Sequence, residues 1–218
     1  MLICFTNTKG GVGKSTLACH LAIWLFDHGH RVALLDADKQ GTATEWIKNA
    51  EPGITVRTAL EMDEIQKARD ELLATHDFVV GDAAGEEGEA SNTLTLLSDI
   101  AIIPLQPSKP DVRALKDGLK AIRLAHAMTG GARPEAILVL NLVRKRSLRS
   151  ARLKEQLRSH GLRVAESDVR RLDPLADACD SAVTRDDRPQ VREAARDIDA
   201  LFSELFGEML QARKVANG

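Results

Sequence analysis

The segment that most constrains the fold is glycine-rich: Lys-Gly-Gly-Val-Gly-Lys-Ser-Thr at residues 9–16. Before it, Leu2–Thr6 is a continuous apolar run, and after it Ser15–Phe26 repeats apolar residues at three- and four-residue spacing. These patterns predict a buried strand, a loop and a helix. Glycines let backbone N–H groups approach phosphate oxygens, and a helix N-terminus adds partial positive charge. The segment therefore predicts a phosphate-binding loop.

The same alternation continues along the chain and predicts the fold class. Short apolar strands that alternate with helices pair in parallel, with helices on both faces of the sheet. We expect an α/β protein with a doubly wound, mostly parallel sheet. The predicted strands are Leu2–Thr6, Arg31–Asp36, Thr55–Thr58, Phe78–Asp82, Ile100–Pro104 and Ala136–Leu142; the predicted helices are Ser15–Phe26, Thr42–Lys48, Glu61–Ala74, Ala90–Leu97, Val112–Met128, Ser147–Ser159 and Arg188–Gln211.

The loops after the predicted strands mark the expected site. Doubly wound sheets bind ligands beyond the carboxyl ends of their strands, so the site is expected in the loops after Thr6, Asp36, Asp82 and Pro104. With 218 residues the chain has the usual size of one such domain, and its sequence has no internal repeat or linker. We predict a single domain over residues 1–218.

Composition excludes several classes of protein. With 44% hydrophobic and 28% charged residues the chain is typical of globular proteins, and no apolar run approaches the roughly 18 residues of a membrane span. The N-terminus carries no export signal, and Cys4, Cys19 and Cys179 share no disulfide or metal spacing, which favours the cytoplasm. The net charge of −2 argues against a uniformly basic nucleic-acid binder, but residues 1–109 carry net −7 and residues 110–218 net +5. The two halves are expected to face different partners.

Lys14 and Ser15 indicate the chemistry of the glycine-rich segment. A lysine at this position reaches the β- and γ-phosphates of a nucleotide, and the next hydroxyl ligates Mg²⁺. A turn with a chance Gly-Lys-Ser is the alternative, and the flanking strand and helix disfavour it. Thr8 stands where the usual motif has its first glycine, and Lys9 follows it.

With Lys9 ahead of the glycines, the segment resembles K-G-G-x-G-K-[ST], the mark of the ParA/MinD family of deviant Walker-A ATPases. The resemblance implies a P-loop NTPase of the SIMIBI type that binds ATP and Mg²⁺ and forms a homodimer around two ATP molecules. It also implies that Lys9 acts in trans on the partner's nucleotide, whereas the residue alone is compatible with a solvated loop lysine. The loop starts at residue 9, so the chain looks most like the small plasmid-type ParA ATPases, which lack an N-terminal helix-turn-helix. The implied nucleotide-binding residues are Lys9, Gly10, Gly11, Val12, Gly13, Lys14, Ser15, Thr16 and Asn141.

Carboxylates follow two of the predicted strands. Phosphoryl transfer to water needs a group that holds the water and carboxylates near the magnesium shell. Asp36-Ala-Asp38-Lys39-Gln resembles the family pattern D-x-D-P-Q, which implies that Asp38 orients the water and Asp36 supports the magnesium shell; two turn-capping aspartates are the alternative. Lys39 in place of proline leaves the timing of hydrolysis open. Asp82 opens Asp-Ala-Ala-Gly after an apolar strand, as a Walker-B carboxylate does. The predicted catalytic residues are Lys9, Lys14 and Asp38, and the predicted metal ligands are Ser15, Asp36 and Asp82.

Two further features belong to the implied nucleotide site. Asn141 ends the last predicted strand, where family members often place an adenine contact, although Asn also simply caps strands and turns. The Pro104–Asp111 segment resembles the proline-rich loop that the family places near the nucleotide and the dimer interface. The sequence contains no guanine-reading N-K-x-D motif, which favours ATP over GTP.

A basic stretch runs from Arg133 to Arg171, with 11 basic and four acidic residues and a net charge of +7. Such charge density attracts the phosphate backbone of DNA without reading sequence, and the absence of aromatic residues argues against stacking on single strands. A solvated helix face is the alternative. Family resemblance also implies nonspecific binding of double-stranded DNA. The predicted DNA-binding residues are Arg144, Lys145, Arg146, Arg149, Arg152, Arg170 and Arg171.

The last predicted helix carries an apolar stripe that needs an explanation. A membrane-surface helix would carry Lys and Arg beside such a stripe, but Glu204, Glu208 and Gln211 stand there. We therefore predict packing on the sheet and no membrane contact. The stripe consists of Leu201, Phe202, Leu205, Phe206, Met209 and Leu210.

The leading hypothesis from sequence is a cytoplasmic, nucleoid-associated partition ATPase with weak Mg-dependent ATP hydrolysis. The resemblance implies that a ParB-like or other adaptor protein on the cargo stimulates hydrolysis and releases the dimer from DNA. The alternatives are a positioning ATPase for a protein cargo or compartment, and a metabolic P-loop enzyme of the synthetase type. The sequence does not distinguish plasmid, chromosome, mobile element or protein cluster as cargo.

Overall fold

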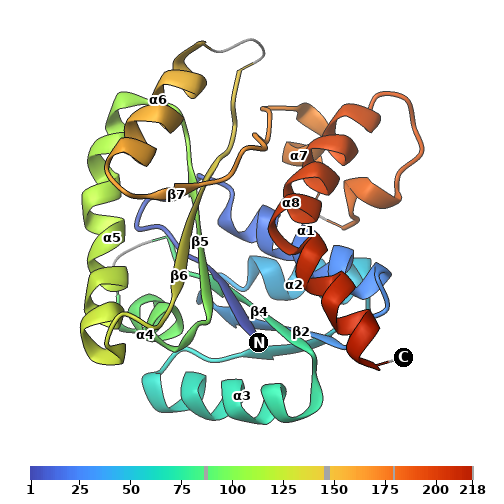
Figure 1. Ribbon diagram of the computed structural model, residues 1–218. Helices are drawn as coiled ribbons and strands as arrows, with labels where there is room; N and C mark the ends of the chain where they lie inside the picture. Colours follow the sequence, from blue (N-terminus) through green and yellow to red (C-terminus); the bar gives the residue numbers. More distant parts are fainter. Residues whose placement is uncertain (86–87, 145–147, 179, 218) are drawn as a thin grey trace.

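One parallel sheet of seven strands organises the computed structural model, which describes residues 1–85, 88–144, 148–178 and 180–217 (Figure 1). The order across the sheet is β3-β2-β4-β1-β5-β6-β7, and every neighbouring pair is parallel. The doubly wound parallel sheet expected from the sequence is therefore confirmed. The strands are β1 (Leu2–Phe5), β2 (Val32–Ala37), β3 (Thr55–Thr58), β4 (Phe78–Ala83), β5 (Ile100–Leu105), β6 (Glu135–Leu140) and β7 (Arg163–Val164).

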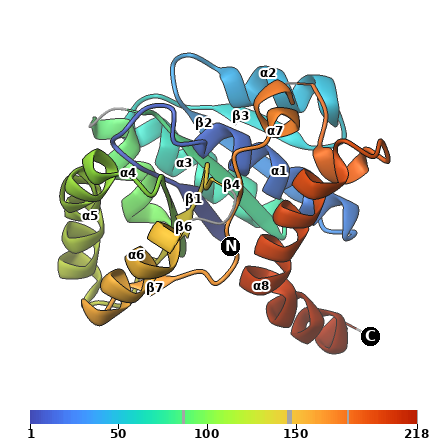
Figure 2. The same cartoon turned by 90° about the horizontal axis from the view of Figure 1, so that it is seen from above.

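Helices cover both faces of this sheet (Figure 2). One face packs against α1 (Lys14–Asp27), α2 (Thr42–Ala50) and α8 (Arg192–Asn217). The opposite face packs against α3 (Met62–Thr75), α4 (Glu89–Leu97), α5 (Lys109–Thr129) and α6 (Leu148–Ser159). The connection from β7 to α8 contains a short helix, α7 (Asp173–Asp177), and a 3₁₀ turn, η1 (Val183–Arg185).

Alternation along each strand explains why both faces are apolar. On β1, Ile3 and Phe5 belong to the core beneath α1 and α8, whereas Leu2 and Cys4 belong to the core beneath α3 and α4. All four side chains are fully buried. A parallel strand with helices on both faces therefore reads as a continuous apolar run, which is the pattern that the sequence shows.

The segment between β7 and α8 differs most from expectation. Neither β7, α7 nor η1 was predicted, because segments of two to five residues carry too few side chains to show a period. The last helix begins at Arg192 rather than Arg188. Asp186 accepts a hydrogen bond from the Arg188 backbone N–H at 2.9 Å and pairs with its guanidinium, so these residues form a turn ahead of the helix.

The apolar stripe of α8 lies in the core, as predicted. Leu201, Phe202, Leu205, Phe206 and Leu210 are buried against the sheet, and Met209 packs partly against them. Among the helices of the described residues, none has the length and hydropathy needed to cross a membrane.

Candidate functional site

The register of the sheet brings the predicted loops to one edge. Asp82 at the end of β4 pairs in register with Phe5 of β1 on one side and with Asp36 of β2 on the other. Residues in register share a face, so Asp36 and Asp82 point toward the side covered by α1 and α2. The phosphate-loop segment leaves β1, which is the neighbour of β4 on the side away from β2, and enters α1. This is the carboxyl edge at which the sequence predicts the site.

The glycine-rich loop has the backbone shape of an anion cradle. Gly11 and Gly13 have φ values of 71° and 91°, in the left-handed region that side chains disfavour. Gly13 is the N-cap of α1, a helix of 14 residues whose first turn has no acidic residue. Its unpaired N–H groups and its dipole favour an anion at this end.

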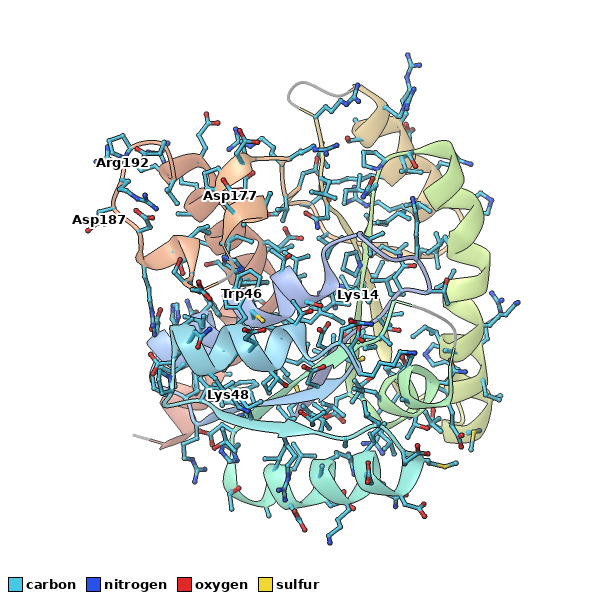
Figure 3. All side chains as sticks on the ribbon, turned by 180° about the vertical axis from the view of Figure 1, so that it is seen from behind. Lys14, Trp46, Lys48, Asp177, Asp187 and Arg192 are labelled. Carbon is cyan, nitrogen blue, oxygen red and sulfur yellow. The ribbon has the colours of Figure 1, made fainter. Side chains whose placement is uncertain are left out.

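Lys14 lies near the middle of the molecule, where α1 begins (Figure 3). Only 6% of its surface is exposed, and its Nζ donates to the Lys9 carbonyl at 3.4 Å, a long hydrogen bond. Burial lowers the pKa of the Lys14 ammonium, while the charges of Asp82 and Asp38 act in the opposite direction. A buried ammonium held by a long hydrogen bond to a neutral carbonyl is suited to bind an anionic ligand.

Asp82 is the least compensated group at this edge. Its carboxylate is fully buried, and neither oxygen has a hydrogen-bond partner of ordinary geometry among the described residues. Burial raises the pKa of this carboxyl to about 7; the nearby Ser15 hydroxyl and Lys14 ammonium lower it, while the Asp36 charge adds to the rise. Two orphaned carboxylate oxygens beside a serine hydroxyl are a fitting donor set for a hydrated Mg²⁺, which prefers oxygen ligands.

The Asp-Ala-Ala-Gly segment comes close to the phosphate loop. A Cβ at Gly85 would lie 3.2 Å from the Gly10 Cα and 3.3 Å from the Lys14 Nζ. Only glycine allows this approach without displacement of the loop or the lysine. The segment that follows Asp82 therefore sits directly on the residues predicted to hold phosphate.

Asp36 and Asp38 have different surroundings. Asp36 is fully buried and accepts hydrogen bonds from the Asp38 N–H at 3.0 Å, the Thr44 N–H at 3.0 Å and the Thr44 hydroxyl at 2.7 Å. Asp38 is partly exposed and accepts from the Gln40 N–H at 2.9 Å. Asp36 thus holds the start of α2 and the loop before it, as expected from the alternative that the aspartates cap a turn. A direct contact between Asp36 and a metal remains a prediction. Asp38 is the carboxylate presented toward the open side.

Asn141 lies directly after β6, and its amide is used to position the phosphate loop. Its Nδ2 donates to the Val12 carbonyl at 2.8 Å, and its Oδ1 accepts from the Leu142 N–H at 2.9 Å. A Cβ at Gly13 would lie only 2.2 Å from the Asn141 Nδ2. The adenine contact that the resemblance implies for Asn141 remains a prediction, because both ends of the amide already have partners.

Two further amides join the loop to β5 and were missed in the sequence. Asn7 donates from Nδ2 to the Pro104 carbonyl at 2.7 Å and accepts from the Lys9 N–H at 3.0 Å. Gln106 donates from Nε2 to the Gly11 carbonyl at 3.1 Å. Both lie in loops that the sequence had connected with the site, after Thr6 and after Pro104, but lone amides carry no periodic or spacing signal that singles them out.

Part of the basic stretch lines an open groove of about 480 Å³ beyond the ends of β5 and β6. Its walls are Gln106, Pro107, Ser108 and Leu142 together with Arg144, Arg149 and Arg171, and we call it the arginine groove. The Arg171 N–H donates to the Val143 carbonyl at 2.9 Å, which sets Arg171 beside Arg144. None of the three arginines forms an ion pair with another described residue.

Other members of the predicted DNA surface lie differently. Arg152 is exposed on α6, and Lys145 and Arg146 lie outside the described residues. The Arg170 guanidinium donates to both carboxylate oxygens of Asp197 at 2.7 and 2.8 Å. This bond raises the pKa of Arg170 and holds its side chain against α8, so the geometry does not support the DNA contact predicted for it. Sequence cannot show this pairing, because Asp197 is 27 residues away.

Several other cations of the stretch are engaged within the chain. Lys154 is 10% exposed and pairs with Asp168 at 2.6 Å, and Arg158 pairs with Glu166 at 2.7 Å. Arg163 pairs with Glu135. These three acidic partners are already counted in the net charge of +7, and the pairs show which cations are held within the chain. Among the described residues predicted to bind DNA, the arginine groove and Arg152 are what remains.

The fold and the glycine loop together define a P-loop nucleotide-binding protein. The chain belongs to the CobQ/CobB/MinD/ParA nucleotide binding domain family, whose model matches residues 3–183.

Individual relatives differ in how much of the chain they match. The carboxysome distribution protein A of Halothiobacillus neapolitanus is 31% identical over 172 residues, which are 76% of this chain and 77% of that protein. The chromosome-partitioning ATPase Soj of Thermus thermophilus is 49% identical over 53 residues, 24% of this chain and 21% of Soj. Cobyrinic acid a,c-diamide synthase of Mycobacterium smegmatis, solved with an ATP analogue and magnesium, superposes with a TM-score of 0.71 at 19% identity and covers 94% of each chain. The last likeness concerns the fold alone.

Proposed function

We propose that this chain is a ParA-like positioning ATPase, which binds Mg·ATP at the phosphate loop and nonspecific DNA at the arginine groove. The proposal rests first on Asp82, a buried carboxylate whose oxygens accept no hydrogen bond from the part of the chain that the structure describes, beside a buried lysine and the glycine cradle. In a folded protein such a group calls for a cation that the chain alone does not supply.

In this proposal, different residues around the loop bind the phosphates, the metal and the attacking water. The backbone N–H groups of Gly10 to Lys14 cradle phosphate oxygens, and Lys14 adds its charge. Ser15 and Asp82 hold the metal through oxygen ligands. Bound Mg²⁺ neutralises developing phosphate charge. Asp38, the exposed carboxylate of the pair, orients the attacking water.

Lys9 and the homodimer complete the proposed ATPase. Two protomers close around two ATP molecules, and each Lys9 reaches the nucleotide of the partner. Binding of ATP by the Lys9→Ala variant without formation of a dimer would support this role. An ATP-dependent dimer of unchanged affinity in that variant would contradict it.

DNA binding is the part of the proposal that the arginine groove supports. Arg144, Arg149 and Arg171 gather at one open surface without ion pairs among the described residues. Three arginines match phosphate oxygens and carry no base-reading geometry of their own. The proposed partner is therefore the backbone of double-stranded DNA, of any sequence.

A retention assay tests this function directly. The chain is passed over immobilised duplex DNA with Mg·ATP, Mg·ADP or no nucleotide. Retention with ATP, and its loss with ADP, supports the positioning ATPase. Equal retention in all three states contradicts it.

A triple variant assigns the DNA surface. Changing Arg144, Arg149 and Arg171 to Ala should weaken DNA binding and reduce the slope of log affinity against log salt by about 3, because each arginine replaces about one counterion. The matched control is Arg188→Ala, an exposed arginine paired with Asp186 ahead of α8, which should leave the slope unchanged. An unchanged slope in the triple variant would remove the groove from the proposal.

The cargo divides the proposal into two forms. Similarity to Soj supports DNA segregation, whereas similarity over three quarters of the chain to a carboxysome distribution protein supports a protein compartment. An adaptor protein on that cargo is proposed to stimulate hydrolysis. Deletion of the gene in its host distinguishes the two forms. If the cargo is DNA, a replicon is inherited less often; if it is a protein compartment, the regular spacing of that compartment is lost.

A metabolic P-loop enzyme of the synthetase type remains the alternative from another class. It predicts ATP turnover that depends on a small-molecule acceptor and ignores DNA. Turnover stimulated by duplex DNA together with a cargo adaptor would exclude it.

A further inference from the structure

One side chain connects the phosphate loop with the arginine groove. Gln106 follows β5, and its Nε2 donates to the Gly11 carbonyl at 3.1 Å across 95 residues of sequence. Gln106, Pro107 and Ser108 also line the arginine groove. The Ser108 N–H donates to the Gln106 carbonyl at 2.7 Å, so the three residues form a tight turn.

The bond fixes one peptide plane of the loop. A trans peptide is planar, with its C=O and N–H pointing in opposite directions. When Gln106 holds the Gly11 carbonyl, the Val12 N–H of the same peptide is turned away from Gln106. Asn141 holds the next carbonyl, that of Val12, in the same manner and turns the Gly13 N–H. The two amides thus set the direction of consecutive N–H donors in the cradle.

The two amide side chains differ in their burial and in their further hydrogen bonds. Asn141 is buried with 4% of its surface exposed, and its own oxygen is tied to the backbone of Leu142. Gln106 is only partly buried and belongs to the groove wall. A rotation of the Val12–Gly13 peptide is therefore resisted at Asn141, whereas a rotation of the Gly11–Val12 peptide is passed on at Gln106, to a segment that lines the groove beside the arginines.

We propose that Gln106 is a positioning residue that couples occupancy of the phosphate loop to the shape of the arginine groove. Nucleotide binding orders the Gly11–Val12 peptide, the ordered carbonyl holds Gln106, and Gln106 holds residues 106–108 in the wall of the groove. The inference rests on the proposed nucleotide and DNA binding, and it assigns the regulation of that DNA surface within one protomer.

Hydrogen exchange tests the coupling without DNA. Exchange is followed in segments 6–17 and 102–110 of the full chain, with and without Mg·ADP, a state that does not require the ATP dimer. In the wild type, ADP should slow exchange in both segments. In Gln106→Ala, saturated with ADP, only segment 6–17 should respond. Gln106→Glu keeps the size but removes the donor, so it should behave like the alanine variant. Gln66→Ala, at an exposed glutamine of α3, is the matched control.

Loss of one neutral hydrogen bond should also raise the Kd for ADP by about two- to tenfold in Gln106→Ala. A normal response of segment 102–110 in Gln106→Ala would overturn the coupling. A wild type that binds ADP but shows no response in segment 102–110 would overturn it equally. A wild type that binds neither ADP nor ATP would contradict the proposed function itself, together with the coupling.

Duplex binding supplies the second readout. The ratio of the affinities for a duplex with and without ATP should fall about fivefold or more in Gln106→Ala. A full ATP-dependent gain in the variant would overturn the coupling and leave the proposed function standing. A wild type without any gain would instead remove the DNA-binding part of that function.

Discussion

Asp82 is a buried carboxylate without a hydrogen-bond partner among the described residues. It is therefore expected to lower the stability of the nucleotide-free protein while it serves to bind Mg·ATP. We predict that Asp82→Asn raises the free energy of unfolding of the nucleotide-free protein by about 1 kcal/mol, because a buried charge is removed at nearly constant volume. The same variant should lose the stabilisation by Mg·ATP. Thermal unfolding with and without Mg·ATP measures both effects, and a less stable Asp82→Asn protein would contradict the prediction.

Gly13 offers a test of the loop backbone. Its φ of 91° and the 2.2 Å approach of a Cβ to the Asn141 Nδ2 predict that Gly13→Ala lowers the free energy of unfolding by about 2 kcal/mol or more and abolishes nucleotide binding. Gly207 in α8 is the matched control, because a Cβ there meets no atom within 4 Å. Gly207→Ala should be neutral or stabilising by up to about 1 kcal/mol. Denaturant titration of both variants gives the comparison.

At this scale the sequence predicted residues whose role depends on spacing and missed those whose role depends on a distant partner. Lys14, Ser15 and Asp82 follow from their positions after strands, and the structure places them together. Gln106 was missed because nothing near it in sequence indicates Gly11 as its partner, 95 residues away. The unexpected contact of Asn141 with Val12 spans 129 residues and escaped prediction for the same reason.

At the scale of elements, His20 joins α1 to η1 through a fully buried ring. Its Nδ1 lies 2.7 Å from the Thr16 carbonyl, and its Nε2 accepts from the Val183 N–H at 3.2 Å. These partners require the neutral ring with its proton on Nδ1. Burial lowers the pKa of His20 from 6.5 to about 4, so the folded state resists protonation. Acid therefore weakens the attachment of η1 to α1.

The pH dependence follows from this shift. Above pH 6.5 both states are neutral at His20, and its full contribution is present. As the pH falls from 6.5 to 4 the unfolded chain binds the proton first, and the free energy of unfolding should decrease by about 3 kcal/mol. Denaturant titrations at pH 7, 5.5 and 4.5 measure this loss. His20→Gln should show a shallower decrease, and an equal decrease in both proteins would exclude His20 as the cause.

Elements were predictable where a period extends over enough residues. Six strands and all helices of nine or more residues were anticipated, within three residues at each end except for α8, which begins at Arg192 rather than Arg188 and ends at Asn217 rather than Gln211. β7 has only two residues, and its pairing depends on α6 and α8: Arg158 donates to the Val164 carbonyl, and Glu204 accepts from the backbone of Glu166 and Ser167 just after the strand. Such an edge is defined by tertiary contacts rather than by local pattern.

For the whole molecule, charge is separated between a carboxylate-bearing nucleotide edge and the arginine groove. If ATP joins two chains as proposed, two grooves act on one duplex, so the ATP state should release about twice as many counterions as a single chain. We predict that the slope of log affinity against log salt with ATP is about twice that with ADP. In the Lys9→Ala variant the slope with ATP should equal the slope with ADP, because the variant is not expected to form the ATP dimer. Equal slopes for the wild type would show that the two grooves do not act together.

The strand order places the glycine-rich loop in the centre of the molecule and leaves the arginine groove at its surface. β1 lies between β4 and β5 at the centre of the sheet, and it delivers the phosphate loop straight into α1, whose residues from Leu17 to Leu25 are all buried. The three arginines of the groove, Arg144, Arg149 and Arg171, are exposed and belong to no core cluster, so substitutions there disturb few core contacts. A lineage built on this plan can vary these exposed side chains while the glycine-rich loop and its buried helix stay the same.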